Sequence, residues 1–169
     1  MIARLRSARP AAMALMTVLA VPAFAQVPAE HYWYDGGQRR PLRLDPARVA
    51  DFGARGGPML QTGPAAVAKA LDAQAAGSVS PVFQDGGGGP ARALPGGMLV
   101  TLRQPLDDAQ ARAWFSARGL TPVRRIGTTA TWLVQTAPGL AALKAANALH
   151  EGGEVAGAEP NWWQQRALK

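Results

Sequence analysis

The stretch that decides the fold is Met98-Leu99-Val100-Thr101-Leu102-Arg103, in which every second side chain, from Met98 to Leu102, is apolar. Successive residues of a strand point to opposite faces, so Met98, Val100 and Leu102 share one apolar face. This pattern predicts a strand that buries one side. We therefore expect a sheet with one covered face to be built around residues 98–103.

A helix is expected after this strand. Asp107 and Asp108 supply carboxylates that can cap a helix N-terminus. Ala111 and Phe115 follow four residues apart, which places them on one helical face. Gly119 then stands where a residue with positive φ commonly ends a helix.

The rest of this half continues with two strands, a second helix and a last strand. Residues 120–126 and 129–136 are apolar and β-branched on either side of a short turn, which predicts an antiparallel pair. A helix is expected over residues 140–150, because apolar side chains recur there at helical spacing and two glycines follow. Residues 154–159 are expected to form the final strand.

The order β-α-β-β-α-β is that of the split-βαβ, ferredoxin-like arrangement. The predicted class is therefore α+β, with two helices covering one face of a four-stranded antiparallel sheet. The other face stays open. On so small a module, an open face needs a partner, either the N-terminal half of the chain or another protein.

The N-terminal half begins with a predicted hairpin. Residues 31–34 and 39–44 are β-prone runs on either side of an Asp-Gly-Gly turn. Pro41 lacks an N–H, so we expect the second strand to lie at an edge of its sheet or to begin there.

Further signals divide the chain into regions. Residues 64–76 can form a helix and 79–83 a short strand, whereas Asp85 to Gly97 has the Gly- and Pro-rich composition of a flexible joint. The expected regions are a hairpin lobe over 26–84, a linker over 85–97, the ferredoxin-like domain over 98–161 and a tail over 162–169.

The first 25 residues are typical of a secretory signal peptide. Three arginines among the first nine residues precede an apolar run over 11–21, and Ala23-Phe24-Ala25 provides a cleavage site. The run is about half the ~20 residues that a spanning helix needs. We expect cleavage after Ala25 and a periplasmic or secreted protein.

Composition argues against several function classes. Removal of the signal peptide leaves 15 cations against 11 acids, a formal charge of +4 in place of +7, without clustered Lys or Arg. Nucleic-acid binding therefore has little support, since it depends on many clustered phosphate contacts. The chain has no cysteine, which excludes disulfides and thiolate metal sites, and fits a bacterial periplasm.

No candidate catalytic centre emerges from the sequence. The serines of the exported chain lie in no recognisable nucleophile motif. The acidic pair Asp107-Asp108 is explained by helix capping, and the glycines at 86–89 lack the Lys-Ser/Thr ending of a phosphate loop. We expect no enzyme activity, no metal and no cofactor.

The tail from Asn161 to Lys169 combines two tryptophans with two cations. In one interpretation the tryptophans fold back over the core and the end frays. In the other, the tail is an extended peptide offered to a partner's cleft and anchored by its tryptophans. The candidate binding residues are Glu159, Asn161, Trp162, Trp163, Arg166, Leu168 and Lys169.

Two segments resemble a known family. Residues 145–161, which end in Ala158-Glu159-Pro160-Asn161, are similar to the closing segment of subtilase propeptides, including the fervidolysin-like group. The opening, Tyr32 to Gly37 with Pro41 to Asp45, resembles the start of the same longer prodomains and of the ASP external chaperone family. Together the two segments bracket nearly all of the exported chain.

This resemblance implies a non-enzymatic partner of a secreted subtilisin-like or kexin-like serine protease. Since no protease domain follows Lys169 here, we expect it to act in trans, as an external chaperone, an inhibitor or both. In the family, the open sheet face packs on two protease helices, and the tail lies in the active-site cleft.

The resemblance also assigns roles to single residues. Glu159 is the first candidate to cap a helix N-terminus of the protease, and Asp107 is the second candidate. If Lys169 fills the primary pocket, Arg166 lies three residues upstream, which suits a protease that prefers basic substrates. The alternative is a periplasmic structural or interaction protein with an unrelated partner.

Overall fold

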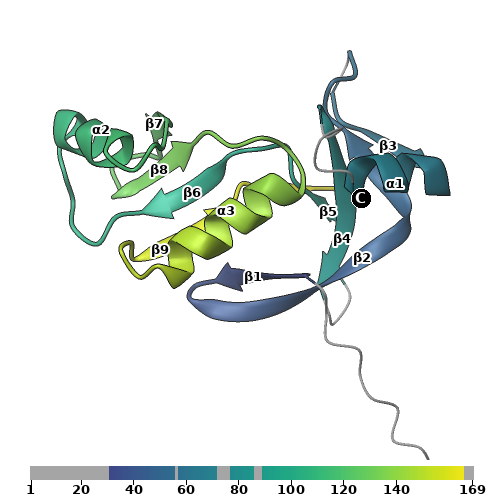
Figure 1. The fold of residues 1–169 in the computed structure, drawn as a ribbon, viewed down its shortest axis with the longest axis horizontal. Helices are drawn as coiled ribbons and strands as arrows, with labels where there is room; N and C mark the ends of the chain where they lie inside the picture. Colours follow the sequence, from purple (N-terminus) through teal and green to yellow (C-terminus); the bar gives the residue numbers. More distant parts are fainter. Residues whose placement is uncertain (1–30, 56, 72–76, 86–88, 166–169) are drawn as a thin grey trace, which may run out of the picture.

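The computed structural model describes residues 31–55, 57–71, 77–85 and 89–165. The predicted signal peptide, and Arg166, Leu168 and Lys169 of the tail, lie outside these ranges. Within them the protein is α+β, with three helices and two antiparallel sheets, as the sequence predicts (Figure 1). None of its described helices has the length and apolar character to cross a membrane.

The first sheet is built mainly from the N-terminal half and has six strands. Their order is β1-β2-β4-β5-β10, with β3 paired to β2, and α1 packs against β2 and β4. The elements are β1 (His31–Asp35), β2 (Gln38–Asp51), β3 (Met59–Thr62), α1 (Pro64–Leu71), β4 (Val79–Asp85), β5 (Arg92–Ala93) and β10 (Trp163–Gln164).

The second sheet has four strands in the order β7-β8-β6-β9, and every pair is antiparallel. Two helices belong to the same half of the chain. The elements are β6 (Met98–Thr101), α2 (Asp108–Ser116), β7 (Pro122–Arg125), β8 (Thr131–Val134), α3 (Leu140–Glu151) and β9 (Gly157–Pro160). The last strand thus begins three residues later than the sequence pattern indicates.

The core of this half forms as the alternation predicts. Met98, Val100 and Leu102 are all buried, and they pack with Ala111 and Phe115 of α2. Buried residues of α3, β8 and β9 complete the same cluster, namely Ala146, Trp132, Val134 and Ala158. Both helices therefore cover one face of the sheet.

The expected flexible joint is wrong for residues 89–97. Ala91, Ala93 and Leu94 are buried, and Ala93 pairs with Val82 of β4. The glycines serve a close backbone approach here: a Cβ on Gly96 would stand 2.8 Å from the carbonyl oxygen of Thr136. At Gly96 the glycine therefore serves a close approach of two backbone segments, and residues 86–88 lie outside the described ranges.

The predicted hairpin is present, but its second strand is not an edge strand. The first residues of β2, up to Pro41, pair with β1 alone. The pairing of β2 with β4 starts at Leu42, so Pro41 lies one residue outside that ladder. Pro41 stands opposite Tyr32. Within the hairpin, β1 is the strand at an edge of the sheet, and it lies alongside α3 (Figure 1).

The two halves share a core. Trp33 and Leu42 of the hairpin pack with Phe83, Leu94 and Leu143, the last of which belongs to α3. Trp162 packs against the same cluster. Near the expected boundary at residues 85–97, the chain therefore passes between two halves that share this cluster, in which strands of the first sheet pack against α3.

Candidate protein-binding face

The face of the second sheet that points away from its helices carries one row of side chains across all four strands. Leu99 of β6 stands between Leu133 of β8 and Glu159 of β9, and Arg124 of β7 stands beside Leu133. Directly opposite residues of paired strands point to the same side. We call this row Arg124–Leu133–Leu99–Glu159 the open row.

The open row is accessible and has a charge at each end. Leu99, Leu133 and Glu159 are half-buried, and Arg124 is exposed. Next to it, the hydroxyls of Thr101 and Thr131 are 2.9 Å apart and share a hydrogen bond. The face thus offers an apolar centre between a cation and a carboxylate, with the neighbouring polar pair already satisfied.

The sequence indicated part of this row. Leu99 falls on the opposite side of β6 from the buried Met98 and Val100, which the alternation alone establishes. The sequence does not single out Leu133, and it indicates only a solvated pair for Arg124 and Arg125, because a register shift between Pro122 and Arg124 decides which side chain of β7 faces outward. Glu159, a predicted binding residue, lies at the end of the row.

Glu159 already has one partner within the chain. The backbone N–H of Gly36, at the hairpin tip, donates to its Oε1 over 3.2 Å. Gly36 has φ +54°, a conformation that glycine adopts at no steric cost. The hairpin thus reaches the edge of the four-stranded sheet and orients the carboxylate.

The remaining described tail residues do not project as an extended peptide. Asn161 donates through Nδ2 to the carbonyl oxygen of Gly96 over 3.1 Å. Trp162 lies edge-on to Trp33, with ring centroids 5.4 Å apart. Trp163 pairs with Ala93 as part of β10 and packs near Phe52.

The idea of a free peptide from Asn161 onward is therefore wrong for residues 161–164. Trp162 and Trp163 are held against the first sheet, where both are half-buried, and Asn161 is held by its hydrogen bond to Gly96. The structure brings Glu159 together with the open face, whereas it places both tryptophans on the neighbouring sheet. Gln165 still bonds to the carbonyl oxygen of Ala91 through its N–H.

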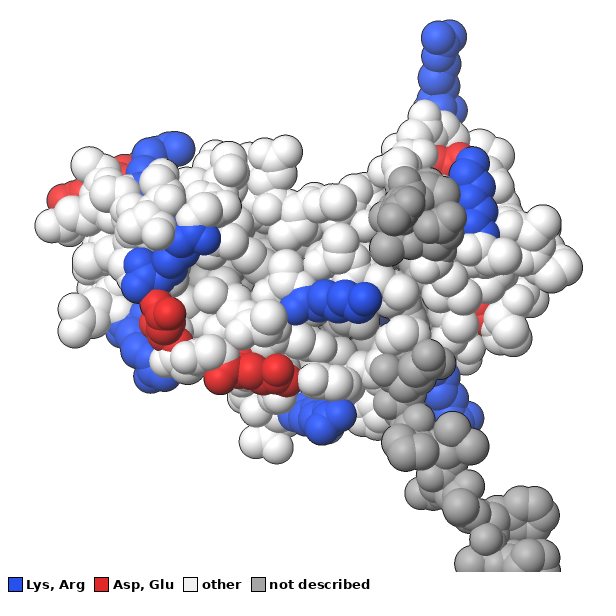
Figure 2. Space-filling model, viewed as in Figure 1, with Lys and Arg blue, Asp and Glu red and all other residues white. Residues whose placement is uncertain are grey.

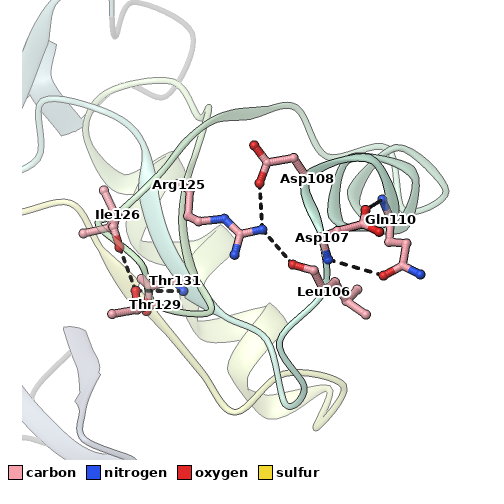
Figure 3. Close-up of polar contacts among 8 residues, drawn as sticks. All are labelled: Leu106, Asp107, Asp108, Gln110, Arg125, Ile126, Thr129 and Thr131. Carbon is pink, nitrogen blue, oxygen red and sulfur yellow. Dashed lines mark hydrogen bonds and ion pairs between the residues drawn. The ribbon is translucent and has the colours of Figure 1, made fainter.

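Asp107 and Asp108 are occupied at the start of α2 (Figure 3). Asp107 accepts from the backbone N–H of Gln110 and the Gln110 side chain accepts from the Asp107 N–H, which is a capping box. The capping interpretation is confirmed, and Asp107 is committed to its own helix. Asp108 pairs with Arg125, whose Nη2 also donates to the Leu106 carbonyl oxygen, both over 2.7 Å.

A second polar cluster, which the sequence did not indicate, joins the hairpin to α3. The hydroxyls of Tyr32 and Tyr34 both donate to Oε1 of Glu151, over 2.8 and 3.0 Å. These hydrogen bonds hold the pKa of the Glu151 carboxyl below its usual range and raise the pKa of both phenols. His150 stacks on Tyr34 with ring centroids 4.0 Å apart.

Charges of both signs are interleaved on the side of the molecule that carries α3 and the hairpin (Figure 2). Such a surface produces no extended field of one sign. Within the described ranges, no three His, Asp or Glu side chains come together in a way that could hold a metal ion.

Comparison with protein-family models, with curated proteins and with solved structures found no match for this chain.

Proposed function

We propose that this protein binds a secreted subtilisin-like protease through the open row and acts as an external chaperone, an inhibitor or both. The observation that carries the proposal is a four-stranded sheet with two helices on one face and an accessible apolar centre on the other. Leu99 and Leu133 supply that centre, and the charges at its ends give a partner one orientation.

The topology supports the resemblance to subtilase propeptides. The elements follow the order β6-α2-β7-β8-α3-β9, and the strands the order β7-β8-β6-β9. We interpret that combination as the ferredoxin-like arrangement, which is the one that the resemblance implies. Fold alone assigns no function, so the weight of the proposal stays on the open row.

Electrostatics suggests how the open row would meet a protease. Two helices lying on the sheet would bury Leu99 and Leu133, which provides the apolar contribution to binding. Glu159 would face the N-terminal end of one helix, where the peptide dipoles favour a carboxylate. The N–H of Gly36 holds Glu159 in place for that contact.

In this proposal the tail enters the protease from a point that β10 fixes. Because β10 ties Trp163 and Gln164 to β5, only the residues after Gln165 remain to enter the protease cleft. Arg166, Leu168 and Lys169 keep their proposed role there, with Lys169 in the primary pocket. Trp162 and Trp163 contribute by fixing the point from which the tail departs.

Chaperoning and inhibition follow from the same contact. A surface that binds the native protease but not its unfolded chain shifts the folding equilibrium toward the native state by mass action. If the contact persists after folding, it inhibits. The proposed setting is the periplasm or the extracellular medium, reached through a signal peptide cleaved after Ala25.

The test is to refold a subtilisin-like protease that lacks its own propeptide, with and without the exported chain. We expect the exported chain to increase the peptidase activity that is recovered after refolding. When the chain is present in excess, we expect it to inhibit the refolded protease. If neither the recovery nor the inhibition changes across several such proteases, the chain serves an unrelated partner and the proposal is wrong.

Variants of the open row make this test specific to the face. Leu99→Thr combined with Leu133→Thr removes the apolar centre and introduces β-branched side chains, which are favoured in strands. We expect protease affinity to fall about tenfold or more with little change in melting temperature. The matched control is Met59→Thr, an exposed apolar residue on β3 of the other sheet, which should bind as the native chain does.

A further inference from the structure

A groove separates the edge strand β1 from α3, on a different surface from the open row. Its volume is about 280 Å³. The floor is formed by Leu140, Leu143 and Ala148, and the rim carries Lys144 at one end and Glu151 at the other. The size suits one or two amino-acid residues, because sites for drug-sized ligands begin at about 300 Å³.

The rim cation is unpaired, whereas the rim anion is not. Glu151 accepts hydrogen bonds from both Tyr32 and Tyr34. Lys144 makes no ion pair or hydrogen bond with any residue in the described part of the chain. The two charges lie seven residues apart on α3, about 10 Å along the axis. An anion beside Lys144 is therefore largely screened from Glu151.

A polar acceptor lies between these two ends. Asn147 is only 8% exposed, and its Nδ2 donates to the carbonyl oxygen of Tyr32 over 2.8 Å. A carbonyl oxygen can only accept, so this contact fixes the orientation of the amide. Its Oδ1 is then left buried without a hydrogen-bond donor among the described residues. Buried polar atoms of this kind normally have a partner.

These three features define the chemistry of a ligand. It needs an apolar group for the floor, an anion for Lys144 and an N–H for Asn147 Oδ1. Lys144 and Asn147 are three residues apart on α3 and line the same groove, so one ligand residue could meet both the cation and the amide oxygen. A fatty acid supplies the first two groups but no donor.

We propose that this groove binds the C-terminal end of a peptide with an apolar last residue. The apolar side chain rests on Leu140 and Leu143, the α-carboxylate pairs with Lys144, and the last amide N–H donates to Asn147. Because Asn147 Oδ1 is covered in the empty groove, β1 must move slightly away from α3 to admit the ligand. The inference does not depend on the proposed protease partner.

The test titrates the full exported chain with N-acetyl-leucine and follows backbone and side-chain amides by NMR. Two analogues each remove one recognised group: N-acetyl-leucinamide lacks the carboxylate and 4-methylpentanoate lacks the N–H. We expect saturable shifts that include the Asn147 side-chain amide, with the acid binding at least about fivefold more tightly than either analogue.

A pair of lysine variants locates the effect. Lys144→Gln should abolish the preference for the acid over N-acetyl-leucinamide, and Lys69→Gln on α1 should preserve it. Both side chains are exposed, so neither change should unfold the chain. Absence of saturable binding, equal affinity for acid and amide, or an unchanged preference in Lys144→Gln would each show that the groove holds only water. None of these results bears on binding through the open row.

Discussion

Arg124 and Arg125 are adjacent in the sequence but lie in different surroundings. Arg124 is exposed at the end of the open row, whereas Arg125 is half-buried, bonds to Leu106 and Asp108, and lies 5.0 Å from the Trp132 ring centroid. We expect Arg125→Ala to lower the free energy of unfolding by about 1–2 kcal/mol, because it removes both polar contacts and the covering of Trp132.

The matched change Arg124→Ala should cost less than about 0.5 kcal/mol, since an exposed side chain loses little on truncation. Denaturant unfolding followed by tryptophan fluorescence measures both. Equal losses in the two variants would mean that the contacts of Arg125 contribute nothing to stability.

Glu151 gives the hairpin contact a dependence on pH. Its pKa is lowered in the folded state by the hydrogen bonds from Tyr32 and Tyr34. A carboxyl with a lowered pKa stabilises the fold above its unfolded pKa of about 4.3, and this contribution is lost as the pH falls through the folded pKa. We therefore expect Glu151→Gln, which keeps an acceptor but cannot ionise, to be less stable than the native chain at neutral pH.

The difference between the native chain and Glu151→Gln should shrink and disappear as the pH falls through the lowered pKa of Glu151, where the native carboxyl becomes protonated. Thermal unfolding of both proteins over a series of buffers measures it. A difference that stays constant with pH would show that the charge of Glu151 has no part in holding the hairpin.

Among the elements, α2 depends on its first turn. Asp107 satisfies the N–H of Gln110, one of the groups that a helix start leaves unpaired. Asp107→Ala should destabilise the chain by about 1 kcal/mol, whereas Asp107→Asn, which keeps an acceptor, should cost clearly less. Melting temperatures of the two variants measure this. Equal losses would contradict the capping role.

Local signals were sufficient for some elements and insufficient for others. The alternation over 98–103 and the caps of α2 depend on neighbouring residues, so the sequence predicts them well. The strands β5 and β10 have two residues each, which is too short to show any period. β10 pairs only through Trp163 and Gln164 with β5, seventy residues earlier in the chain, and β5 itself pairs with β4. Such a pairing leaves no trace in either segment.

The residues of the candidate site also divide into those that local sequence signals could predict and those that they could not. Glu159 and the open side of the sheet could be predicted, because a helix-covered sheet of known strand pattern has one free face. The position of the tryptophans could not, since the tail's composition suits a free peptide and a buried strand equally. Its burial was decided by Trp33 and Phe83, which come from the other half of the chain.

At the scale of the whole molecule, the C-terminus stabilises the N-terminal sheet. Trp162 packs on Trp33 and Phe83, and β10 extends the sheet beyond β5. A chain ending at Asn161 loses both tryptophans, so we expect the free energy of unfolding to fall by about 3 kcal/mol or more. A chain ending at Gln165 keeps every contact of β10 and should melt as the full chain does.

The same two truncations separate folding from protease binding. The chain ending at Gln165 lacks Arg166, Leu168 and Lys169, so its inhibition constant for a subtilisin-like protease should rise sharply while its melting temperature is unchanged. Inhibition as strong as that of the full chain would exclude insertion of the tail and leave the open row as the whole contact. If instead the chain ending at Asn161 melts at the native temperature, β10 does not hold the two sheets together, and the tail is free from Trp162 onward.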